Sequence, residues 1–184
     1  MLITLDGFSG SGKSTLAKKL EREIPGIRVI KADDFFYQRG EKRDKRAGNF
    51  NVRRFIKEVT PQIKRGSGFF IRAYDCRSGK FFKKWIPEGN ITILEGSYTS
   101  TPSLDSYRDL GFFVNCDRKE REIRVKSREG DNYLNFLNRW FKDEYNFEIK
   151  FRTYKNSVIV NNYNELRDYI CGEKLLKIKN LQVR

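Results

Sequence analysis

The stretch that decides the fold is GFSGSGKS, which runs from Gly7 to Ser14. It matches the pattern G-x-x-x-x-G-K-[S/T], which is typical of loops that hold the phosphates of a nucleoside triphosphate. Glycines let backbone N–H groups surround the phosphates, a lysine reaches the β and γ oxygens, and the final hydroxyl is a ligand for Mg²⁺. The predicted nucleotide-binding residues are Gly7, Ser9, Gly10, Ser11, Gly12, Lys13, Ser14 and Thr15.

The segments on either side of this loop support the interpretation. Residues 2–5 are apolar and predict a buried strand, and residues 14–20 begin a helix with Leu16, Ala17 and Leu20 on one face. The alternative is a turn rich in glycine and serine that contains an unrelated lysine. A strand before the loop and a helix after it favour the phosphate-binding interpretation.

Strands and helices alternate along the rest of the chain. The periodicity predicts strands at 2–5, 28–32, 69–74, 80–85, 91–94, 111–115 and 158–160, and helices at 14–23, 52–63, 119–128, 133–145 and 164–170. This order predicts an α/β fold, with a parallel sheet covered on both faces and ligands at the carboxyl ends of the strands. Residues 1–184 are expected to form one domain, and the tail from Lys174 is ambiguous between strand and helix.

Acidic residues follow two of these strands, on the edge where the phosphate-binding loop is expected. Asp33 is the candidate to orient an attacking hydroxyl and accept its proton, and Glu95 suits Mg²⁺ or its waters. Ser14, Asp33 and Glu95 are therefore the predicted metal-site residues. The alternatives are a helix N-cap for the pair Asp33 and Asp34, and a solvated loop acid for Glu95.

Arginines lie about one turn apart on the helix predicted at 119–128. Arg124 and Arg128 have i, i+4 spacing, with Arg121 nearby, and they predict a lid that closes over the phosphates. A charged solvent-facing surface of the helix explains the same pattern.

The charge of the chain is strongly positive and uneven. Lys and Arg number 38 against 24 Asp and Glu, for a net charge of +14, and residues 38–65 hold ten basic and three acidic residues. One explanation of the excess positive charge is that it attracts the nucleoside triphosphate and that the genome favours lysine codons. The other is that the protein binds a polyanionic partner such as nucleic acid. Four aromatic residues that flank this basic segment suit either base stacking or the core: Phe35, Phe36, Tyr37 and Phe50.

Composition narrows the chemistry further. The chain has no histidine, which argues against a zinc site or a histidine proton shuttle, so a general base is expected to be a carboxylate. The scattered Cys76, Cys116 and Cys171 predict reduced thiols in the core. No apolar stretch has the length of a membrane span and no leader is evident, so the expectation is a cytoplasmic protein without a membrane partner.

Several stretches together resemble the uridine kinase family of P-loop kinases and, to a lesser degree, the nicotinamide riboside kinases. The likeness extends over residues 2–162 and rests on GFSGSGKST at 7–15, ADDFF at 32–36, GNFN at 48–51, YDC at 74–76, ILEGSY at 93–98, RVKSREG at 124–130 and the segment 139–144. It implies an ATP- and Mg²⁺-dependent kinase with a five-stranded parallel sheet, a small lid at about 118–132 and a β-hairpin insertion. It also implies that Asp33 activates the acceptor hydroxyl.

The departures from the family lie on the acceptor side. Asn51 stands where the family has an aspartate for the ribose diol, the histidine expected near Tyr74 is absent, and Thr101 and Pro102 replace a His-Pro pair. The residues that the resemblance places at the acceptor are Asn51, Tyr74, Arg77 and Phe36, beside the basic segment 38–65.

These features favour a kinase that phosphorylates a hydroxyl of a nucleoside-like small molecule. The second hypothesis is a kinase for a hydroxyl on DNA or RNA, at a modified base or a strand end. The third is an ATP-binding switch that transfers no phosphate. The sequence leaves the oligomeric state open.

Overall fold

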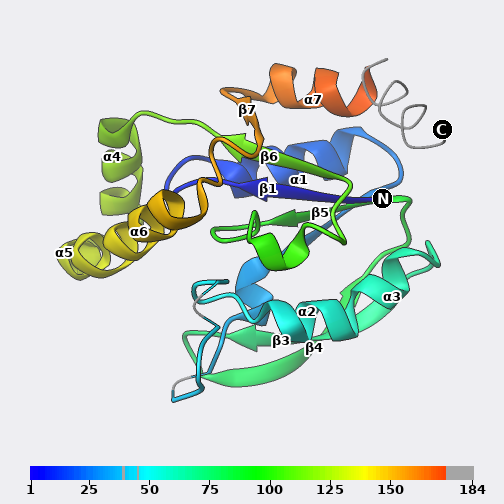
Figure 1. Ribbon diagram of the computed structural model, residues 1–184, viewed down its shortest axis with the longest axis horizontal. Helices are drawn as coiled ribbons and strands as arrows, with labels where there is room; N and C mark the ends of the chain where they lie inside the picture. The colour runs from blue at the N-terminus through cyan, green and yellow to red at the C-terminus, as the bar shows by residue number, and fades with distance from the viewer. Residues whose placement is uncertain (39, 45, 173–184) are drawn as a thin grey trace.

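A five-stranded parallel sheet forms the centre of the protein, as seen in the computed structural model, which describes residues 1–38, 40–44 and 46–172. Its strands lie in the order β2-β5-β1-β6-β7 (Figure 1). They span Leu2–Asp6 (β1), Ile27–Lys31 (β2), Ile91–Glu95 (β5), Leu110–Val114 (β6) and Val158–Val160 (β7). The predicted parallel sheet is confirmed. The predicted tail from Lys174 lies outside the described residues.

Helices cover both faces of this sheet. On one face, α1 (Lys13–Glu23) and α7 (Tyr163–Cys171) pack against β1 and β6, and their apolar stripes share one buried cluster. On the other face lie the short helices η1 (Ala32–Phe35), α2 (Val52–Glu58), α3 (Thr60–Ile63) and η2 (Pro102–Leu104). The layers follow from the apolar strands, which are buried on both faces and need cover on each.

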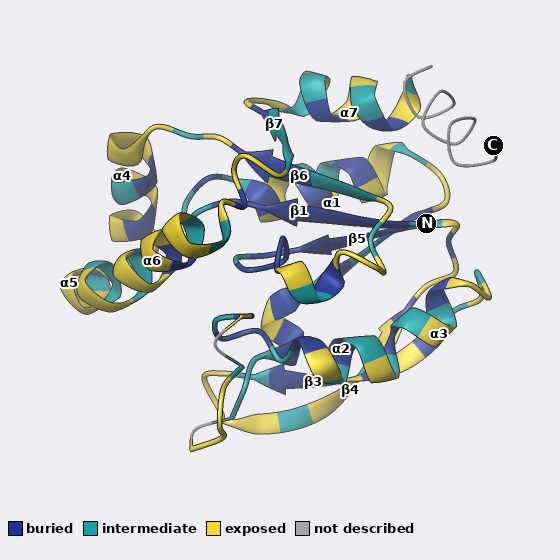
Figure 2. Cartoon of the chain, viewed as in Figure 1, coloured by how far each residue is buried: buried dark blue, intermediate teal, exposed yellow. Residues whose placement is uncertain are grey.

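An antiparallel hairpin forms a second, two-stranded sheet beyond α2. It consists of β3 (Phe69–Asp75) and β4 (Lys80–Ile86), as the sequence predicts. One side of the hairpin is buried against η1 and α2, and β4 is largely exposed along the lower edge in Figure 2.

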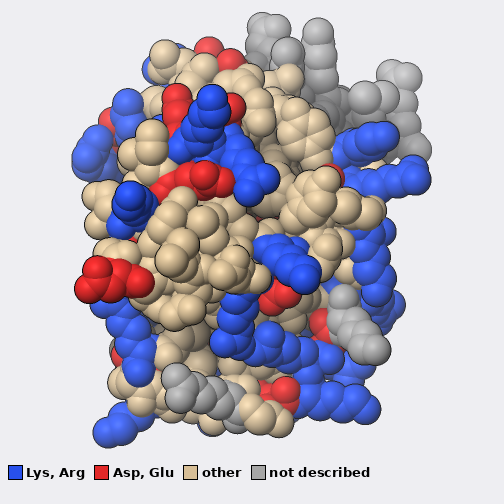
Figure 3. Space-filling model, turned by 90° about the vertical axis from the view of Figure 1, so that its left-hand side faces the viewer, with Lys and Arg blue, Asp and Glu red and all other residues tan. Residues whose placement is uncertain are grey.

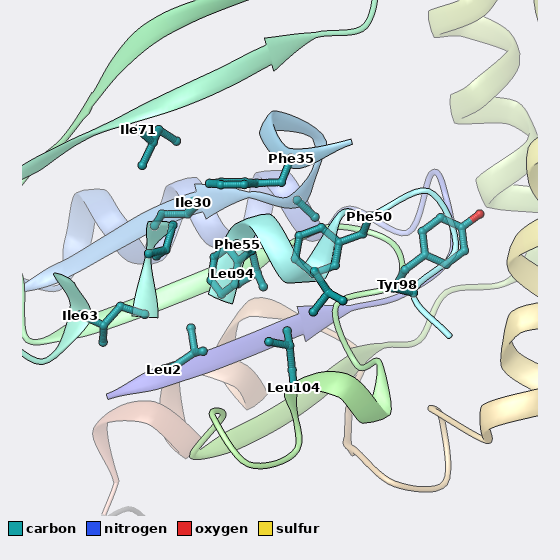
Figure 4. Packing of buried hydrophobic residues seen from close by; sticks show 14 of the residues in the cluster. Leu2, Ile30, Phe35, Phe50, Phe55, Ile63, Ile71, Leu94, Tyr98 and Leu104 are labelled. Carbon is teal, nitrogen blue, oxygen red and sulfur yellow. The ribbon is translucent and has the colours of Figure 1, made fainter. Parts of the chain in front are cut away.

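The core between the sheet and the hairpin is rich in aromatic residues. Phe35, Phe50 and Phe55 are fully buried, and the rings of Phe35 and Phe55 lie 5.4 Å apart (Figure 4). Tyr98 and Leu104 extend this cluster toward the end of β5. Phe35 and Phe50 are therefore core residues and are not free to stack on a base.

A group of helices projects from one end of the sheet. It contains α4 (Arg118–Glu129), η3 (Gly130–Asn132), α5 (Tyr133–Phe136), the π-helical η4 (Leu137–Phe141) and α6 (Lys142–Phe151), at the left of Figure 1. The helix predicted at 133–145 thus continues to Phe151 and contains a π-helical turn. Together these helices include the lid predicted at about 118–132.

Two expectations are corrected by the structure. The helix predicted at 52–63 is divided after Glu58, because Pro61 has no N–H group to donate to the preceding turn. The thiols are free, but they are not in the core: Cys76 and Cys171 are exposed and Cys116 is partly exposed. Each cysteine lies at a turn or at the end of an element, where solvent reaches it.

No helix in the described part of the chain combines the length and the apolar character that a membrane span requires.

Candidate active site

The phosphate-binding loop joins β1 to the N-terminus of α1. Gly12 precedes the helix with φ of 95°, and Gly10 has φ of 81°, so both occupy backbone conformations that favour glycine. A Cβ atom at Gly10 would lie 2.7 Å from the backbone oxygen of Arg121 on α4. Glycine at this position therefore also allows the lid helix to approach the loop.

Two predicted ligand groups of this loop, Ser14 and Lys13, form hydrogen bonds with other parts of the protein. The hydroxyl of Ser14 donates to Oε2 of Glu95 at 2.9 Å, which joins the start of α1 to the end of β5. Lys13 is buried, and its Nζ donates to the backbone oxygen of Phe8 at 3.0 Å. Thr15 is exposed in the first turn of α1.

Glu95 is a buried carboxylate rather than a solvated loop acid. It is 4% exposed at the end of β5. Burial raises its pKa, and the charge of Lys13 and the hydrogen bond from Ser14 act in the opposite direction. A buried carboxylate beside a lysine and a hydroxyl is a position that a cation would stabilise.

Asp33 lies within η1, directly after β2, and its side chain is accessible to solvent. Desolvation by the surrounding protein raises its pKa, and the positive charge of Lys13 lowers it. The alternative role as a helix N-cap does not hold, because the N-cap of η1 is Lys31 and no side chain caps that turn. Asp33, Lys13 and Glu95 thus interact electrostatically on one edge of the sheet.

This set of oxygens fits Mg²⁺ that is held together with a nucleotide. Among the described residues there is no group of three or more His, Cys, Asp or Glu side chains arranged to hold a metal ion. Mg²⁺ in phosphotransferases commonly uses only one or two carboxylates and takes its other ligands from phosphates and water. Ser14 and Glu95, with Asp33 nearby, are a donor set of that kind.

Glu144 on α6 is a site residue that sequence analysis did not select. Its carboxylate accepts hydrogen bonds from the backbone N–H of Ser9 at 2.8 Å, from the Ser9 hydroxyl at 2.5 Å and from the Ser97 hydroxyl at 2.7 Å. It is 6% exposed. A buried carboxylate therefore links α6 to the phosphate-binding loop and to the segment after β5. The segment 139–144 carried part of the family resemblance, but nothing in the sequence paired Glu144 with Ser9.

The three lid arginines have different surroundings. Arg121 is buried, with its guanidinium 4.7 Å from the ring centre of Phe8 and 5.1 Å from that of Phe141. Arg124 donates to the backbone oxygen of Gly10 at 3.2 Å and pairs with Glu120 at 3.0 Å. Arg128 pairs with Glu129 at 2.7 Å, and its charge helps to lower the pKa of Asp33. Arg124 thus contacts the phosphate-binding loop, whereas Arg128 contacts Glu129 and the ring of Phe136 on α5. The closure of a lid over phosphates stays a prediction.

The residues predicted at the acceptor differ in their surroundings and in how far they are buried. Oδ1 of Asn51 accepts the backbone N–H of Arg54 at 3.1 Å and so caps α2. Tyr74 is buried, with its ring 5.2 Å from that of Phe81, and Phe36 is partly buried against the core. These contacts give Asn51, Tyr74 and Phe36 structural roles.

The turn of the β3–β4 hairpin lies within electrostatic reach of Asp33. Desolvation, followed by the negative charge of Asp33, raises the pKa of the Cys76 thiol to about 11. Arg77 is exposed in the same turn, and its backbone N–H donates to Asp75. Sequence analysis noted Cys76 as a thiol and as part of the YDC stretch at 74–76, but it did not pair Cys76 with Asp33, because their separation depends on how the hairpin folds back.

Two basic side chains hold the hairpin beside this site. Lys84 on β4 pairs with Asp34 at 2.7 Å. Arg54 on α2 donates to the backbone oxygen of Asp34 and lies between the rings of Phe35 and Phe81, at 4.6 and 5.1 Å from their centres. The hairpin is thereby fixed to the turn that contains the candidate base.

Positive charge surrounds the site on one side. Figure 3 shows the side of the molecule at which the strands end, and Lys and Arg gather over its lower half, where the hairpin and the loop before α2 lie. Part of the basic segment 38–65 forms this region. A negatively charged ligand is favoured there by long-range attraction.

Comparison with known proteins identifies the fold. No model of a protein family matches the sequence. A cytidylate kinase from Ignicoccus hospitalis is 26% identical over 153 residues, which cover 82% of this chain and 78% of that protein.

Solved structures of kinases have a similar fold over most of the chain. A protein described as a possible uridine kinase from Bacillus stearothermophilus superposes with a TM-score of 0.66 and 18% identity, covering 88% of each chain. A shikimate kinase from Bacteroides thetaiotaomicron gives a TM-score of 0.51 and 18% identity over 88% of this chain and 85% of that one. The chain therefore has the fold of P-loop kinases, and the resemblance predicted from sequence is confirmed at the level of the fold.

Proposed function

We propose that this protein is a Mg²⁺- and ATP-dependent kinase that transfers the γ-phosphoryl group to a hydroxyl of a nucleoside-like acceptor. One observation carries the proposal: the loop of Lys13, the Ser14–Glu95 pair and the accessible carboxylate of Asp33 lie on one edge of a P-loop kinase sheet. Phosphoryl transfer needs positioning and charge neutralisation more than covalent chemistry, and this edge offers both.

Each residue has a distinct role in this proposal. The ammonium of Lys13 and the loop N–H groups bind the β- and γ-phosphates, and Ser14 and Glu95 hold Mg²⁺. When bound, Mg²⁺ neutralises charge on the phosphates. Asp33 accepts the proton of the acceptor hydroxyl as the bond from that oxygen to phosphorus forms and the bond to the leaving oxygen breaks. Its raised pKa favours proton acceptance.

A kinase for a hydroxyl on nucleic acid is the second candidate. The observation that favours it is the basic lower half of the site face in Figure 3, beside the hairpin turn. The capping role of Asn51 is compatible with it, since that side chain is already bonded to α2. A polyanionic acceptor would bind there with a steep dependence on salt.

Substitution of the proposed base tests the proposal. Asp33→Asn should lower kcat at least a hundredfold, because the amide cannot accept the proton, while ATP affinity changes less than about threefold. The matched control is Asp168→Asn, an exposed residue on α7 that pairs with its neighbour Arg167. Near-normal turnover of Asp33→Asn would contradict the assigned role.

The acceptor class is tested with γ-labelled ATP. The enzyme is incubated in parallel with free nucleosides and with DNA and RNA oligonucleotides, and the labelled fraction is identified. Label in a nucleoside supports the first candidate, and label in an oligonucleotide supports the second. Tight ATP binding with no label in any pool would contradict both and favour an ATP-binding switch.

A further inference from the structure

One face of the β3–β4 hairpin carries aromatic and basic side chains in adjacent cross-strand pairs. Phe70 lies directly opposite Trp85, and Arg72 lies directly opposite Lys83. Residues opposite each other in an antiparallel pair share a face of the sheet, so these four side chains lie together. We call them, with the neighbouring Phe81, the hairpin patch.

The hairpin patch is open to solvent, whereas most of the other face is buried and only its β4 end, with Phe82, is exposed among the described residues. Phe70 is 54% exposed and Trp85 is 53% exposed, and Arg72 and Lys83 are also exposed. The opposite face packs into the core through Phe69, Ile71, Ala73 and Ile86. Two large aromatic side chains exposed side by side are unusual on a free surface and are typical of a binding site.

Cations are interleaved with these rings and lie directly over them. Nζ of Lys83 is 4.0 Å from the ring centre of Phe70, and the guanidinium of Arg72 is 4.1 Å from that of Phe81. Within the described part of the chain neither Arg72 nor Lys83 forms an ion pair with a carboxylate. Positions of this face on both strands carry no acidic residue in the sequence: they are Phe70, Arg72, Tyr74, Phe81, Lys83 and Trp85.

The patch also has a shape that can receive a ligand. A shallow, open groove of about 310 Å³ is lined by Phe70, Arg72, Phe81 and Lys83 of this face and by Ile71 and Phe82 of the other. It presents apolar ring surface with basic groups along it. A flat apolar ligand group with a negatively charged linkage on each side matches this pattern.

We propose that the hairpin patch binds single-stranded nucleic acid. Unpaired bases stack on the exposed rings of Trp85 and Phe70, and the guanidinium of Arg72 and the ammonium of Lys83 bind the phosphates between them. A second copy of this chain fits less well, because it would place Arg72 and Lys83 of both copies against one another. A purely apolar partner would leave the same two cations desolvated and without a counterion.

The position of the patch connects it to the candidate active site. Phe70 is five residues from Asp75 along β3, which corresponds to roughly 17 Å of strand. The ion pair of Lys84 with Asp34, at 2.7 Å, joins β4 to the turn that contains Asp33. Binding at the patch goes beyond the proposed kinase activity, because it requires neither ATP nor phosphoryl transfer. The two proposals can therefore fail separately.

Binding is measured by fluorescence anisotropy with the full chain and fluorescein-labelled oligonucleotides, without ATP. Single-stranded DNA, single-stranded RNA and duplex DNA of mixed sequence are compared between 50 and 200 mM salt, on the order of the range over which phosphate contacts lose most affinity. The expected result is binding of the single strands that weakens with salt, and weaker binding of the duplex, whose bases are already stacked.

Variants of the patch separate stacking from charge. Trp85→Ala and Phe70→Ala should each weaken binding about tenfold or more at constant salt, as expected when one stacked base is lost. Arg72→Gln and Lys83→Gln should each reduce the slope of log K against log salt by about 0.7, the value for one phosphate contact of a single strand. In Trp140→Phe, the remaining Trp85 fluorescence should be quenched when an oligonucleotide binds.

Matched controls remove the same groups elsewhere. Lys18→Gln removes one exposed charge from α1, and Tyr107→Ala removes an exposed ring that is 44% accessible. Both should bind oligonucleotides like the unmodified protein.

Four outcomes would overturn the proposal. The first is that no oligonucleotide binds at about 50 mM salt, and the second is that Lys18→Gln weakens oligonucleotide binding as much as Lys83→Gln does. The third is that duplex DNA binds as tightly as single strands. The fourth is that the protein self-associates and that Trp85→Ala abolishes this self-association. The last would identify the patch as an interface between two copies. Binding with the expected variant pattern but no phosphorylation of any acceptor would support the patch and contradict the proposed kinase activity.

Discussion

At the scale of single residues, Glu144 joins α6 to the phosphate-binding loop and to the segment after β5. Its carboxylate accepts three hydrogen bonds, from Ser9 N–H, Ser9 Oγ and Ser97 Oγ, in a buried position. A buried donor left without an acceptor loses its interaction with water and gains nothing in return. Glu144 therefore holds the phosphate-binding loop in place from the side of α6.

Removal of this carboxylate should weaken both the fold and nucleotide binding. Glu144→Ala is expected to lower the free energy of unfolding by about 2–4 kcal/mol, because three donors lose a charged acceptor. ATP affinity should fall with it, since Ser9 is no longer held. Urea denaturation and ATP titration measure the two effects. The exposed pair of Arg118 and Glu122 supplies the control Glu122→Ala, for which a loss above about 1 kcal/mol is not expected.

Asp6 predicts a pH dependence of stability. Burial raises its pKa to about 6 from 3.8, although the N–H groups of Gly7 and Ser100 donate to it. Between these pH values the folded chain holds a proton that the unfolded chain has lost. The contribution of Asp6 to the free energy of unfolding is therefore most favourable below pH 3.8. This contribution falls by about 3 kcal/mol as the pH rises to about 6.

Urea denaturation at a series of pH values from 4 to 7 gives the free energy of unfolding of the unmodified protein and of Asp6→Asn. The quantity compared is the difference between the two free energies at each pH. The difference should fall with rising pH, because the asparagine does not titrate and other groups cancel. Parallel curves for the two proteins would show that Asp6 keeps an ordinary pKa.

At the scale of elements, Arg28 on β2 connects the sheet to both ends of the hairpin. Its side chain is fully buried and donates to Thr92 Oγ1 at 2.8 Å and to the backbone oxygens of Ser67 and Pro87 at 2.9 and 3.2 Å. Ser67 precedes β3 and Pro87 follows β4. One guanidinium thus satisfies polar groups from three separate segments.

Loss of this arginine should destabilise the protein where the two ends of the hairpin, at Ser67 and Pro87, join the sheet. Arg28→Ala is expected to cost about 3 kcal/mol or more, because buried carbonyls lose their donor and a cavity remains. Arg28→Lys should recover only part of the loss, since one ammonium cannot reproduce the planar fork. Urea denaturation checks both variants. Arg22→Ala, at an exposed position on α1, is the control and should change stability by less than about 0.5 kcal/mol.

At the scale of the whole molecule, three parts meet at the carboxyl ends of the strands: the sheet with its phosphate-binding loop, the helices from α4 to α6, and the hairpin. Glu144 joins the first to the second, and the Lys84–Asp34 ion pair joins the first to the third. Ligand bound between them is expected to stabilise the molecule as a whole.

Mg²⁺-ATP should therefore raise the melting temperature. At a ligand concentration of about 100 times Kd the gain is about 2.7 kcal/mol, which corresponds to roughly 5–10 °C for a domain of this size. Differential scanning calorimetry measures the shift. Lys13→Ala should lose most of it, because the phosphates lose their main cation. A full shift in that variant would indicate that ATP binds elsewhere.

Much of the fold was predictable, because the apolar periodicity of each segment matches the strand or helix that it forms in the folded protein. The strands at 28–32 and 158–160 and the hairpin strands at 69–74 and 80–85 appear within one or two residues of their predicted ends. The helix at 52–63 was wrong in its continuity, because apolar periodicity continues across Pro61 although the hydrogen-bond ladder does not.

The sequence by itself determined the phosphate-binding loop and the carboxylates at the strand ends, because each follows from residues within a few positions of one another. It determined the parallel sheet through the alternation of strands and helices along the chain. Only the tertiary structure paired Ser14 with Glu95 and Ser9 with Glu144, brought Cys76 toward Asp33 and left Phe70 and Trp85 exposed together. These relations depend on how the lid helices and the hairpin return to the sheet. Contacts between residues far apart in the chain leave no periodic signal in the sequence, and they decide the shape of the site.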